Sequence, residues 1–192
     1  MKSLLRQDHY SLDWVKDFYT QAGIWWGEDP QAAGTHAERV KIVERLCGVG
    51  SKRILDLGAG PGRTMAAMAE AGHAVVGVEL NPTDAAYARE LLKGTATFLE
   101  ADFYTVALEG VFDVVTCWQV FGIGSDADQR RLLRRIEQEW LAEGGSVLLD
   151  VYNPAGPARD AGKEWRLAPL KGVPGSVEMF ERCHYDPVQG RW

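Results

Sequence analysis

The chain has 192 residues, of which 46% are hydrophobic and 25% are charged. This composition is typical of one globular domain with a sizeable core, and it excludes a disordered tail or a fibrous repeat. Acidic residues (27) outnumber basic ones (21), and the resulting net charge of −6 argues against nucleic acid or an anionic membrane as a partner.

Signals for export and for metal binding are not found in the sequence. Residues 1–14 carry charges every few positions, without the apolar run that a signal peptide needs. The sequence contains no run of about 18 uncharged apolar residues, which a membrane helix requires. Cys47, Cys117 and Cys183 are widely spaced, with no CxxC or Cys/His pattern. We therefore expect a cytoplasmic protein with free thiols, no metal and no membrane partner.

Residues 1–34 are rich in large aromatic side chains, among them Tyr10, Trp14, Phe18, Trp25 and Trp26. So many aromatic rings are unusual in a solvent-exposed arm. We expect this segment to form a helical cap over an edge or the mouth of a sheet. The adjacent pair Trp25 and Trp26 also suits a flat apolar ligand.

Residues 35–153 alternate between short apolar runs and amphipathic stretches. This alternation is typical of right-handed βαβ units, and strands that are apolar nearly throughout are covered on both faces. The predicted fold class is α/β, with a doubly wound, mostly parallel, Rossmann-like sheet. The predicted strands are residues 53–57, 74–80, 97–101, 112–118 and 146–152.

Local signals mark the helices between these strands. A capping box from Thr35 to Glu38 predicts the start of one helix, and Asn81 followed by Pro82 predicts another. Asp126 is the expected N-cap of a third. The same helix carries four arginines, and two glutamates lie beside them. This mixture of charges indicates an ordinary solvated face, formed by Arg130, Arg131, Arg134 and Arg135.

Residues 154–192 contain five of the eight prolines and are predicted to be mostly loop. Only residues 177–185 have the pattern of a strand, and no partner for it is predicted. The fifth strand of the main sheet would then leave an exposed edge. We therefore expect the C-terminal strands to be incomplete, so that the polypeptide continues beyond Trp192 or associates through this edge.

The segment after the first strand indicates a nucleotide-type cofactor. Gly58, Gly60 and Gly62 lie between a buried strand and a helix, where glycine allows positive φ and a close approach of the backbone to a ligand. Arg63 stands where a dinucleotide-binding fingerprint has its third small residue, which argues against NAD. The wider loop suits an uncharged thioether chain and its amino acid better than a pyrophosphate.

Acidic residues follow the next two strands. Glu79 ends the second strand, where a carboxylate can accept hydrogen bonds from both ribose hydroxyls. Asp102 follows the third strand and can accept from an adenine amine, with Phe103 or Leu80 packing against the ring. Because the carboxyl ends of parallel strands share one edge, we expect these residues to meet at one crevice.

These ordered motifs resemble those of class I S-adenosylmethionine-dependent methyltransferases. The resemblance covers roughly residues 35–153 and is carried by residues 56–62, Glu79, Asp102, 112–121 and 144–153. It is nearest to the small-molecule branch, whose members have an N-terminal helical cap. It implies S-adenosylmethionine as cofactor and direct in-line methyl transfer to a small-molecule acceptor, with no metal and no covalent enzyme intermediate. It further implies that residues 177–192 are the first half of a lid hairpin.

The resemblance also assigns the cofactor-binding residues. The glycine loop would lie along the methionine part, Glu79 would bind ribose, and Asp102 would bind adenine. Asp56 would orient the loop or the amino group, and the Cys117 carbonyl would meet that amino group. The full predicted set is Asp56, Gly58, Ala59, Gly60, Glu79, Leu80, Asp102, Phe103 and Cys117.

The acceptor site is less well marked. Aromatic and histidine residues in segments near the crevice are the candidates, namely Trp25, Trp26, Trp118, Phe121 and His184. No residue stands out as a general base. Enzymes that methylate the amines of nucleic-acid bases have an Asn/Asp-Pro-Pro-aromatic motif at the fourth strand. Here residues 117–120 are Cys-Trp-Gln-Val instead, so a nucleic-acid base is not the expected acceptor.

Two alternatives stay open. An NAD(P)-dependent oxidoreductase of Rossmann type shares the fold, but it would need a small residue in place of Arg63 and a catalytic Tyr/Lys or similar set. A non-catalytic module that binds S-adenosylmethionine would look the same through residue 153, and only turnover distinguishes it. The acceptor and the oligomeric state are not indicated by the sequence.

Overall fold

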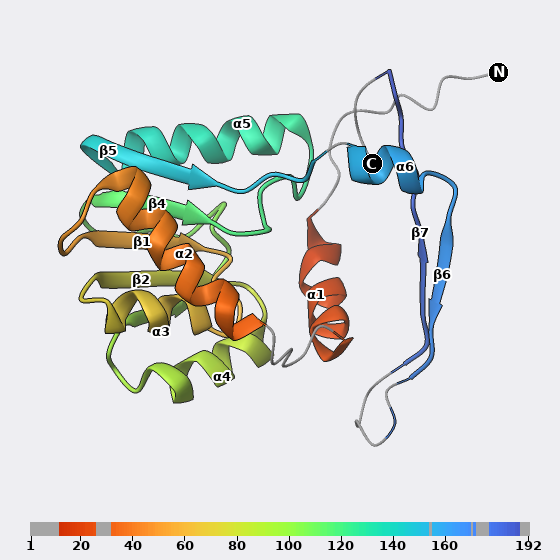
Figure 1. Cartoon of the computed structure of the whole chain (residues 1–192), viewed down its shortest axis with the longest axis horizontal. Coiled ribbons are helices and arrows are strands. Elements are labelled where there is room, and N and C mark those ends of the chain that lie inside the picture. The colour runs from red at the N-terminus through yellow and green to blue at the C-terminus, as the bar shows by residue number, and fades with distance from the viewer. Residues whose placement is uncertain (1–11, 26–31, 154, 170, 172–176, 189–192) are drawn as a thin grey trace.

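A five-stranded parallel sheet forms the centre of the computed structural model, which describes residues 12–25, 32–153, 155–169, 171 and 177–188 (Figure 1). The strand order is β3-β2-β1-β4-β5, and every neighbouring pair is parallel. This arrangement confirms the predicted fold class. The strands are β1 (Arg53–Leu57), β2 (Ala74–Glu79), β3 (Thr97–Glu100), β4 (Phe112–Cys117) and β5 (Leu141–Leu149).

Helices cover both faces of this sheet. The covering elements are α2 (Ala32–Cys47), α3 (Arg63–Glu70), α4 (Pro82–Leu92), α5 (Asp126–Arg135) and the π-helical turn η1 (Ile136–Trp140). Side chains alternate along the strands, so Ile54 packs on one face in a cluster with residues of α2, α3 and α4. Leu55 packs on the other face with Leu132 of α5 and Trp140 of η1. The sheet is therefore doubly wound.

The helix starts agree with the sequence only in part. Asn81 caps α4 as predicted, because its side chain accepts a hydrogen bond from the Thr83 amide at 2.9 Å. The capping box at Thr35 is wrong, because α2 already begins at Ala32. Ser125 caps α5 in place of Asp126, and its hydroxyl accepts from the Asp128 amide in a capping box.

The fifth strand lies earlier in the chain than the predicted 146–152. The η1 turn leads directly into β5, and the pairing with β4 contains an irregularity between Phe112 and Val114. Gly144 and Gly145, a pattern typical of the end of a helix, lie within the strand. Asp150 to Tyr152 therefore form the loop after β5 rather than its last residues.

The N-terminal helix α1 (Asp13–Trp25) stands beyond the carboxyl ends of the sheet strands (Figure 1). Trp14 and Phe18 are about half exposed and form an edge-to-face ring pair with 5.7 Å between centroids. One helix of the predicted cap is thus present. Tyr10 and Trp26 lie outside the described residues.

The C-terminal segment contains α6 (Ala155–Asp160), β6 (Glu164–Leu167) and β7 (Met179–Arg182). β6 and β7 form an antiparallel pair that is separate from the main sheet. The prediction that the strand in 177–185 has no partner is therefore wrong. β5 is an edge strand that pairs only with β4 among the described residues, so association through this edge, or a longer polypeptide, stays a prediction.

Within the described residues, no helix is long and apolar enough to cross a membrane, and no three His, Cys, Asp or Glu side chains gather as a metal site. The three cysteines are unpaired.

Candidate functional site

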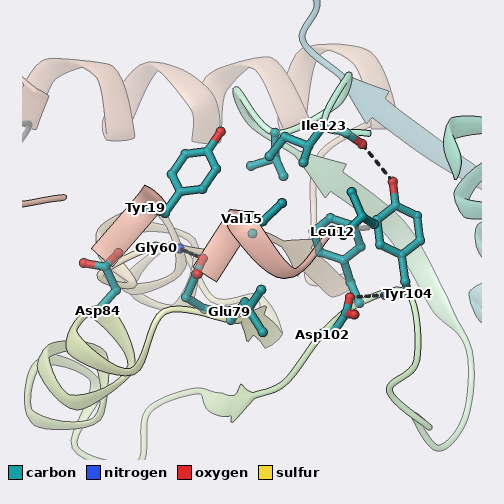
Figure 2. Close-up of a pocket in the computed structure, with 13 residues that line it drawn as sticks. Leu12, Val15, Tyr19, Gly60, Glu79, Asp84, Asp102, Tyr104 and Ile123 are labelled. Atoms are coloured by element: carbon teal, nitrogen blue, oxygen red, sulfur yellow. Dashed lines mark hydrogen bonds between the residues drawn. The ribbon is translucent and has the colours of Figure 1, made fainter. Parts of the chain in front are cut away.

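A cavity of about 160 Å³ lies where the carboxyl ends of β1, β2 and β3 face the N-terminal segment (Figure 2). Six of the nine predicted cofactor-binding residues line it: Gly58, Gly60, Glu79, Leu80, Asp102 and Phe103. The other lining residues were not predicted and are Leu12, Val15, Tyr19, Asp84, Tyr104, Val120 and Ile123. The predicted crevice therefore exists at the expected edge of the sheet.

The glycine loop requires glycine at position 58 for two reasons. Gly58 has a φ of 68°, and a Cβ built there would lie 2.5 Å from Cγ2 of Val120. The Gly58 and Ala59 amides both donate to the Val78 carbonyl, at 2.8 and 3.0 Å. These bonds fold the loop back over β2 and leave its backbone against the cavity.

Glu79 is oriented by the backbone on either side of it. Its carboxylate accepts from the Gly60 amide at 2.9 Å and from the Asn81 amide at 2.7 Å (Figure 2 shows the first of these bonds). Burial raises the pKa of Glu79, and the two amide bonds oppose that shift. Because each carboxylate oxygen can accept more than one hydrogen bond, Glu79 keeps capacity for two hydroxyl groups of a ligand.

Asn81 connects this carboxylate to the helix above it. Its side chain is 2% exposed and donates to the Tyr19 carbonyl of α1 at 3.2 Å and to the Asp84 carboxylate at 3.0 Å. Val15 and Tyr19 of α1 thereby cover the cavity from outside. Burial raises the pKa of Asp84, which lines the cavity on the side of Glu79.

The opposite side of the cavity is built by the loop after β3. The Asp102 carboxylate accepts from the Tyr104 amide at 2.7 Å, and the Tyr104 hydroxyl donates to the Ile123 carbonyl at 3.0 Å (Figure 2). The rings of Phe103 and Tyr104 pack with centroids 4.8 Å apart. Burial raises the pKa of Tyr104 to about 12, so its hydroxyl stays a donor at neutral pH.

Arg135 of α5 holds the loop after β3 in place through hydrogen bonds to its backbone. Its guanidinium donates to the carbonyls of Phe103 and Val106, each at 2.7 Å, and forms an ion pair with Glu139 at 2.8 Å. Its guanidinium carbon lies 4.5 Å from the centroid of the Trp140 ring. The prediction of an ordinary solvated arginine face is therefore wrong for this residue.

Gln129 of α5 joins the same loop to the one after β4. Its side-chain amide nitrogen donates to the Tyr104 hydroxyl at 3.3 Å and to the Ile123 carbonyl. Its carbonyl oxygen accepts from the Gly122 amide at 3.0 Å. α5 thus sets the positions of two loops that line the cavity.

Asp56, Ala59 and Cys117 lie in or next to the strand ends but do not line the cavity. Asp56 is 1% exposed and accepts from the Thr116 hydroxyl at 2.7 Å, and burial raises its pKa to about 7. Burial also raises the pKa of the Cys117 thiol to about 12, which rules out a thiolate nucleophile at neutral pH. The Cys117 carbonyl accepts from the Asp150 amide at 3.3 Å and retains a second lone pair.

Arg39 is a polar residue that the sequence motifs do not reveal. Its guanidinium donates to the Thr64 hydroxyl at 3.0 Å, reaches the Gln119 side chain at 3.5 Å and lies 5.1 Å from the Trp118 ring centroid. No carboxylate among the described residues lies within ion-pair distance of it, and burial lowers its pKa. Asp56 and Asp150 interact with Arg39 only at longer range, so this half-buried cation can bind an anionic ligand group.

The predicted acceptor contacts are not brought together at the cavity. Trp118 is partly buried beside Arg39, and Phe121 packs against the hydrophobic cluster that contains Leu55. His184 is exposed and does not line the cavity. The Trp25 side chain and all of Trp26 lie outside the described residues, so these two predictions stay open.

Comparison with known proteins agrees with this architecture. The family model described as "Methyltransferase domain" matches residues 54–145, from β1 into β5. A ubiquinone biosynthesis O-methyltransferase of Pseudomonas aeruginosa is 28% identical over 148 residues, which are 72% of this chain and 62% of the relative. The cypemycin N-terminal methyltransferase of a Streptomyces species is 32% identical over 106 residues, 54% of this chain and 43% of the relative. The chain thus spans less than two thirds of these relatives.

Solved structures share the fold. The CcbJ methyltransferase from Streptomyces caelestis superposes with a TM-score of 0.66 at 23% identity, covering 91% of this chain and 68% of that one. The glycopeptide N-methyltransferase MtfA complexed with S-adenosylmethionine gives a TM-score of 0.60 at 20% identity, covering 80% and 72%. Together with the family model and the relatives, this shared fold makes the chain similar to S-adenosylmethionine-dependent methyltransferases.

Proposed function

We propose that the chain is an enzyme that binds S-adenosylmethionine in the cavity at the ends of β1, β2 and β3 and transfers its methyl group to a small-molecule acceptor. The observation that carries the proposal is Glu79. This carboxylate lines the cavity at the carboxyl end of β2, held by the Gly60 and Asn81 amides with accepting capacity left for a ribose.

The other residues divide among the parts of the cofactor. Asp102 accepts from the adenine amine, and Leu80 and Phe103 pack against its ring. The glycine loop, with Gly58, Ala59 and Gly60, lies along the methionine chain, and Arg39 is the cation available for the methionine carboxylate. The Cys117 carbonyl accepts a hydrogen bond from the amino group of the methionine part. Asp56 orients either that amino group or the glycine loop.

For this reaction the protein mainly has to align the methyl group of the cofactor with the acceptor atom. When bound, the cofactor supplies a methyl group on a positively charged sulfur, which an acceptor attacks in line. Acidic side chains line the cavity while no Lys, Arg or His of the described residues does so, which favours a cationic ligand. The α1 side chains exclude water from the reacting groups.

A small-molecule acceptor is supported by the names of the relatives and by the residues after β4, which lack the motif for base amines. Trp118, Phe121, Trp25, Trp26 and His184 remain the proposed acceptor contacts. The acceptor would enter between a helical cap (residues 1–34) and a lid (residues 154–192) that flank the core (residues 35–153). A cytoplasmic location is part of the proposal, and the three unpaired cysteines are consistent with it.

Calorimetric titration with S-adenosylmethionine, its demethylated product and NAD tests the cofactor assignment. We expect micromolar dissociation constants for the first two and much weaker binding of NAD, because Arg63 interrupts the pyrophosphate fingerprint. NAD binding as tight as that of S-adenosylmethionine would favour the oxidoreductase alternative.

Turnover separates an enzyme from a binding module. The protein is incubated with methyl-labelled cofactor and a panel of small carboxylates, phenols and amines, and transfer of label is measured. We expect transfer to at least one class. Tight cofactor binding without transfer to any acceptor class would support the non-catalytic alternative.

A further inference from the structure

The β6–β7 pair carries an edge that lacks a partner among the described residues. All its side chains except Met179 are exposed, and the pair forms a sheet of its own, set apart from the central one (Figure 1). An isolated two-stranded sheet is at best marginally stable in water. Its stability therefore calls for a further contact.

Hydrogen bonds show which backbone groups of β7 face outward. The Cys183 amide donates to the Lys163 carbonyl at 3.0 Å, and the Cys183 carbonyl accepts from the Gly162 amide at 2.8 Å. Cys183 therefore faces β6. Because backbone direction alternates along a strand, Glu178, Phe180 and Arg182 direct their N–H and C=O groups to the other edge, where no strand among the described residues pairs.

The side chains at this free edge are complementary to those of a second copy in the opposite direction. Within the hairpin, Glu178 lies 3.9 Å from Arg166 and Arg182 forms an ion pair with Glu164, and all four side chains are exposed enough to share these contacts with a second copy. Glu178 and Arg182 lie two positions on either side of Phe180. If two copies of β7 pair antiparallel with the two-fold axis at Phe180, the two Phe180 residues face each other and Glu178 faces the second copy's Arg182. Phe180, the residue at the axis, already directs its backbone outward, as this pairing requires.

The residues that would meet also share one face. Phe180 pairs with Arg166 across the β6–β7 ladder, and Arg182 pairs with Glu164. Phe180 is 53% exposed, and the guanidinium carbons of Arg166 and Arg182 lie 5.6 and 5.9 Å from its ring centroid. A second Phe180 ring placed opposite gives the aromatic cross-strand contact that stabilises antiparallel pairs.

We propose that this edge of β7 is the interface with a second copy of the same chain, in a two-fold dimer whose hairpins join into the four-stranded sheet β6-β7-β7-β6. The proposal is independent of the cofactor assignment. It concerns an edge distinct from that of β5, through which the sequence predicted association.

Charge reversal tests the pairing. Light scattering should give the wild-type chain twice the 21.2 kDa mass of one copy. Glu178→Arg places Arg opposite Arg at both ends of the interface, and Arg182→Glu places Glu opposite Glu. Each variant alone should raise the dimer dissociation constant at least about tenfold. An equimolar mixture of the two should restore the dimer, because every facing pair is again of opposite charge.

Glu181→Arg controls for the charge change alone. It makes the same change on β7, but the Glu181 backbone faces β6 and the residue pairs with Trp165. We expect this variant to remain dimeric.

The single variants and their mixture all lose ion pairs inside the hairpin, Glu178–Arg166 or Arg182–Glu164, so restoration of the dimer in the mixture reports on the interface. A monomeric wild type at micromolar concentration overturns the proposal, and so does a dimer that both single reversals leave intact. Failure of the mixture to reassociate overturns it as well.

Discussion

Glu79 is the residue on which the proposed site depends most. Its two carboxylate oxygens each accept one backbone amide, so its rotamer is set before any ligand arrives. Such preorganisation lowers the entropy cost of binding. A side chain that is already held in place loses little freedom when two hydroxyls are added to it.

Replacing Glu79 by Ala should weaken cofactor binding by at least about tenfold, or around 1.4 kcal/mol, because both ribose hydroxyls lose an ionised acceptor. Calorimetry measures the loss. Glu100→Ala is the control, since Glu100 ends the neighbouring strand but forms a surface ion pair with Arg89. Unchanged affinity in Glu79→Ala, with a native circular dichroism spectrum, would show that the ribose assignment is wrong.

Asp56 should make stability depend on pH. Burial raises its pKa from 3.8 to about 7 in the folded state, so the folded protein binds this proton more tightly than the unfolded chain does. The contribution of Asp56 to stability is therefore fully present below pH 4 and is lost as the pH rises to about 7.

Asp56→Asn keeps an acceptor for Thr116 without the ionisation. Between pH 4 and 7, the free energy of unfolding of the variant should rise relative to wild type, by up to about 1.4 kcal/mol per pH unit. Urea unfolding at several pH values measures this difference. A difference that stays constant over this range would contradict the raised pKa.

At the residue scale, Glu79 and Asp102 are predictable because each lies at the end of a recognisable strand, whereas Asp84, which also lines the cavity, lies in α4 and was not predicted. The order of strands and loops along the chain is enough to place Glu79 and Asp102 at one edge of the sheet. Arg39 and Tyr19 were missed, because their positions depend on how α2 and α1 pack on the sheet. That packing leaves no signal in the spacing of the motifs.

Among the elements, α5 has the clearest consequence for function. Arg135 satisfies two carbonyls of the loop that carries Asp102 and Phe103. Arg135→Met leaves both carbonyls without this donor, at a cost of about 1–3 kcal/mol for each one that stays unsatisfied.

We expect Arg135→Met to lower the melting temperature and to weaken cofactor binding several-fold, because the adenine side of the cavity loses its anchor. Thermal unfolding and calorimetry give the two readouts. Arg134→Met removes the neighbouring, exposed arginine and should change neither. Native affinity in Arg135→Met would mean that the loop keeps its position without α5.

The second element with a testable role is α1. Val15 and Tyr19 of this helix line the cavity, so the side chains of α1 limit the space that a ligand can occupy.

A larger side chain on the covered face of α1 should compete with the ligand. Val15→Phe is expected to weaken cofactor binding about tenfold, because the ring fills space that the cofactor needs. Calorimetry compares it with Lys16→Phe, which places the same ring on an exposed position of the same helix. Equal effects of the two substitutions would argue against a role of Val15 at the site.

Helices and strands were predicted best where a single sequence signal marked their ends. β1 has the predicted bounds, because a continuous apolar run ends at the glycine loop. β5 was placed too late, because two glycines inside it resemble a helix stop. β6 was missed because it is short and lies in a proline-rich segment, and its pairing with β7 is a tertiary contact.

At the scale of the whole molecule, the sheet order explains why the site lies where it does. β1 is central, with β2 and β4 on either side, so their carboxyl ends converge beneath α1. The glycine loop follows β1, Glu79 ends β2 and a further lining loop follows β4, so all three lie at the same edge of the sheet. The parallel topology thus places the cavity at the centre of the edge, and the two C-terminal strands form a separate sheet.

A crystal structure of the protein with the demethylated cofactor tests this account most directly. We predict density in the cavity beneath α1, with both ribose hydroxyls within hydrogen-bond distance of the Glu79 carboxylate, the adenine between Leu80 and Phe103, and the methionine carboxylate at Arg39. A ligand bound elsewhere, or bound here with its ribose away from Glu79, would contradict the account.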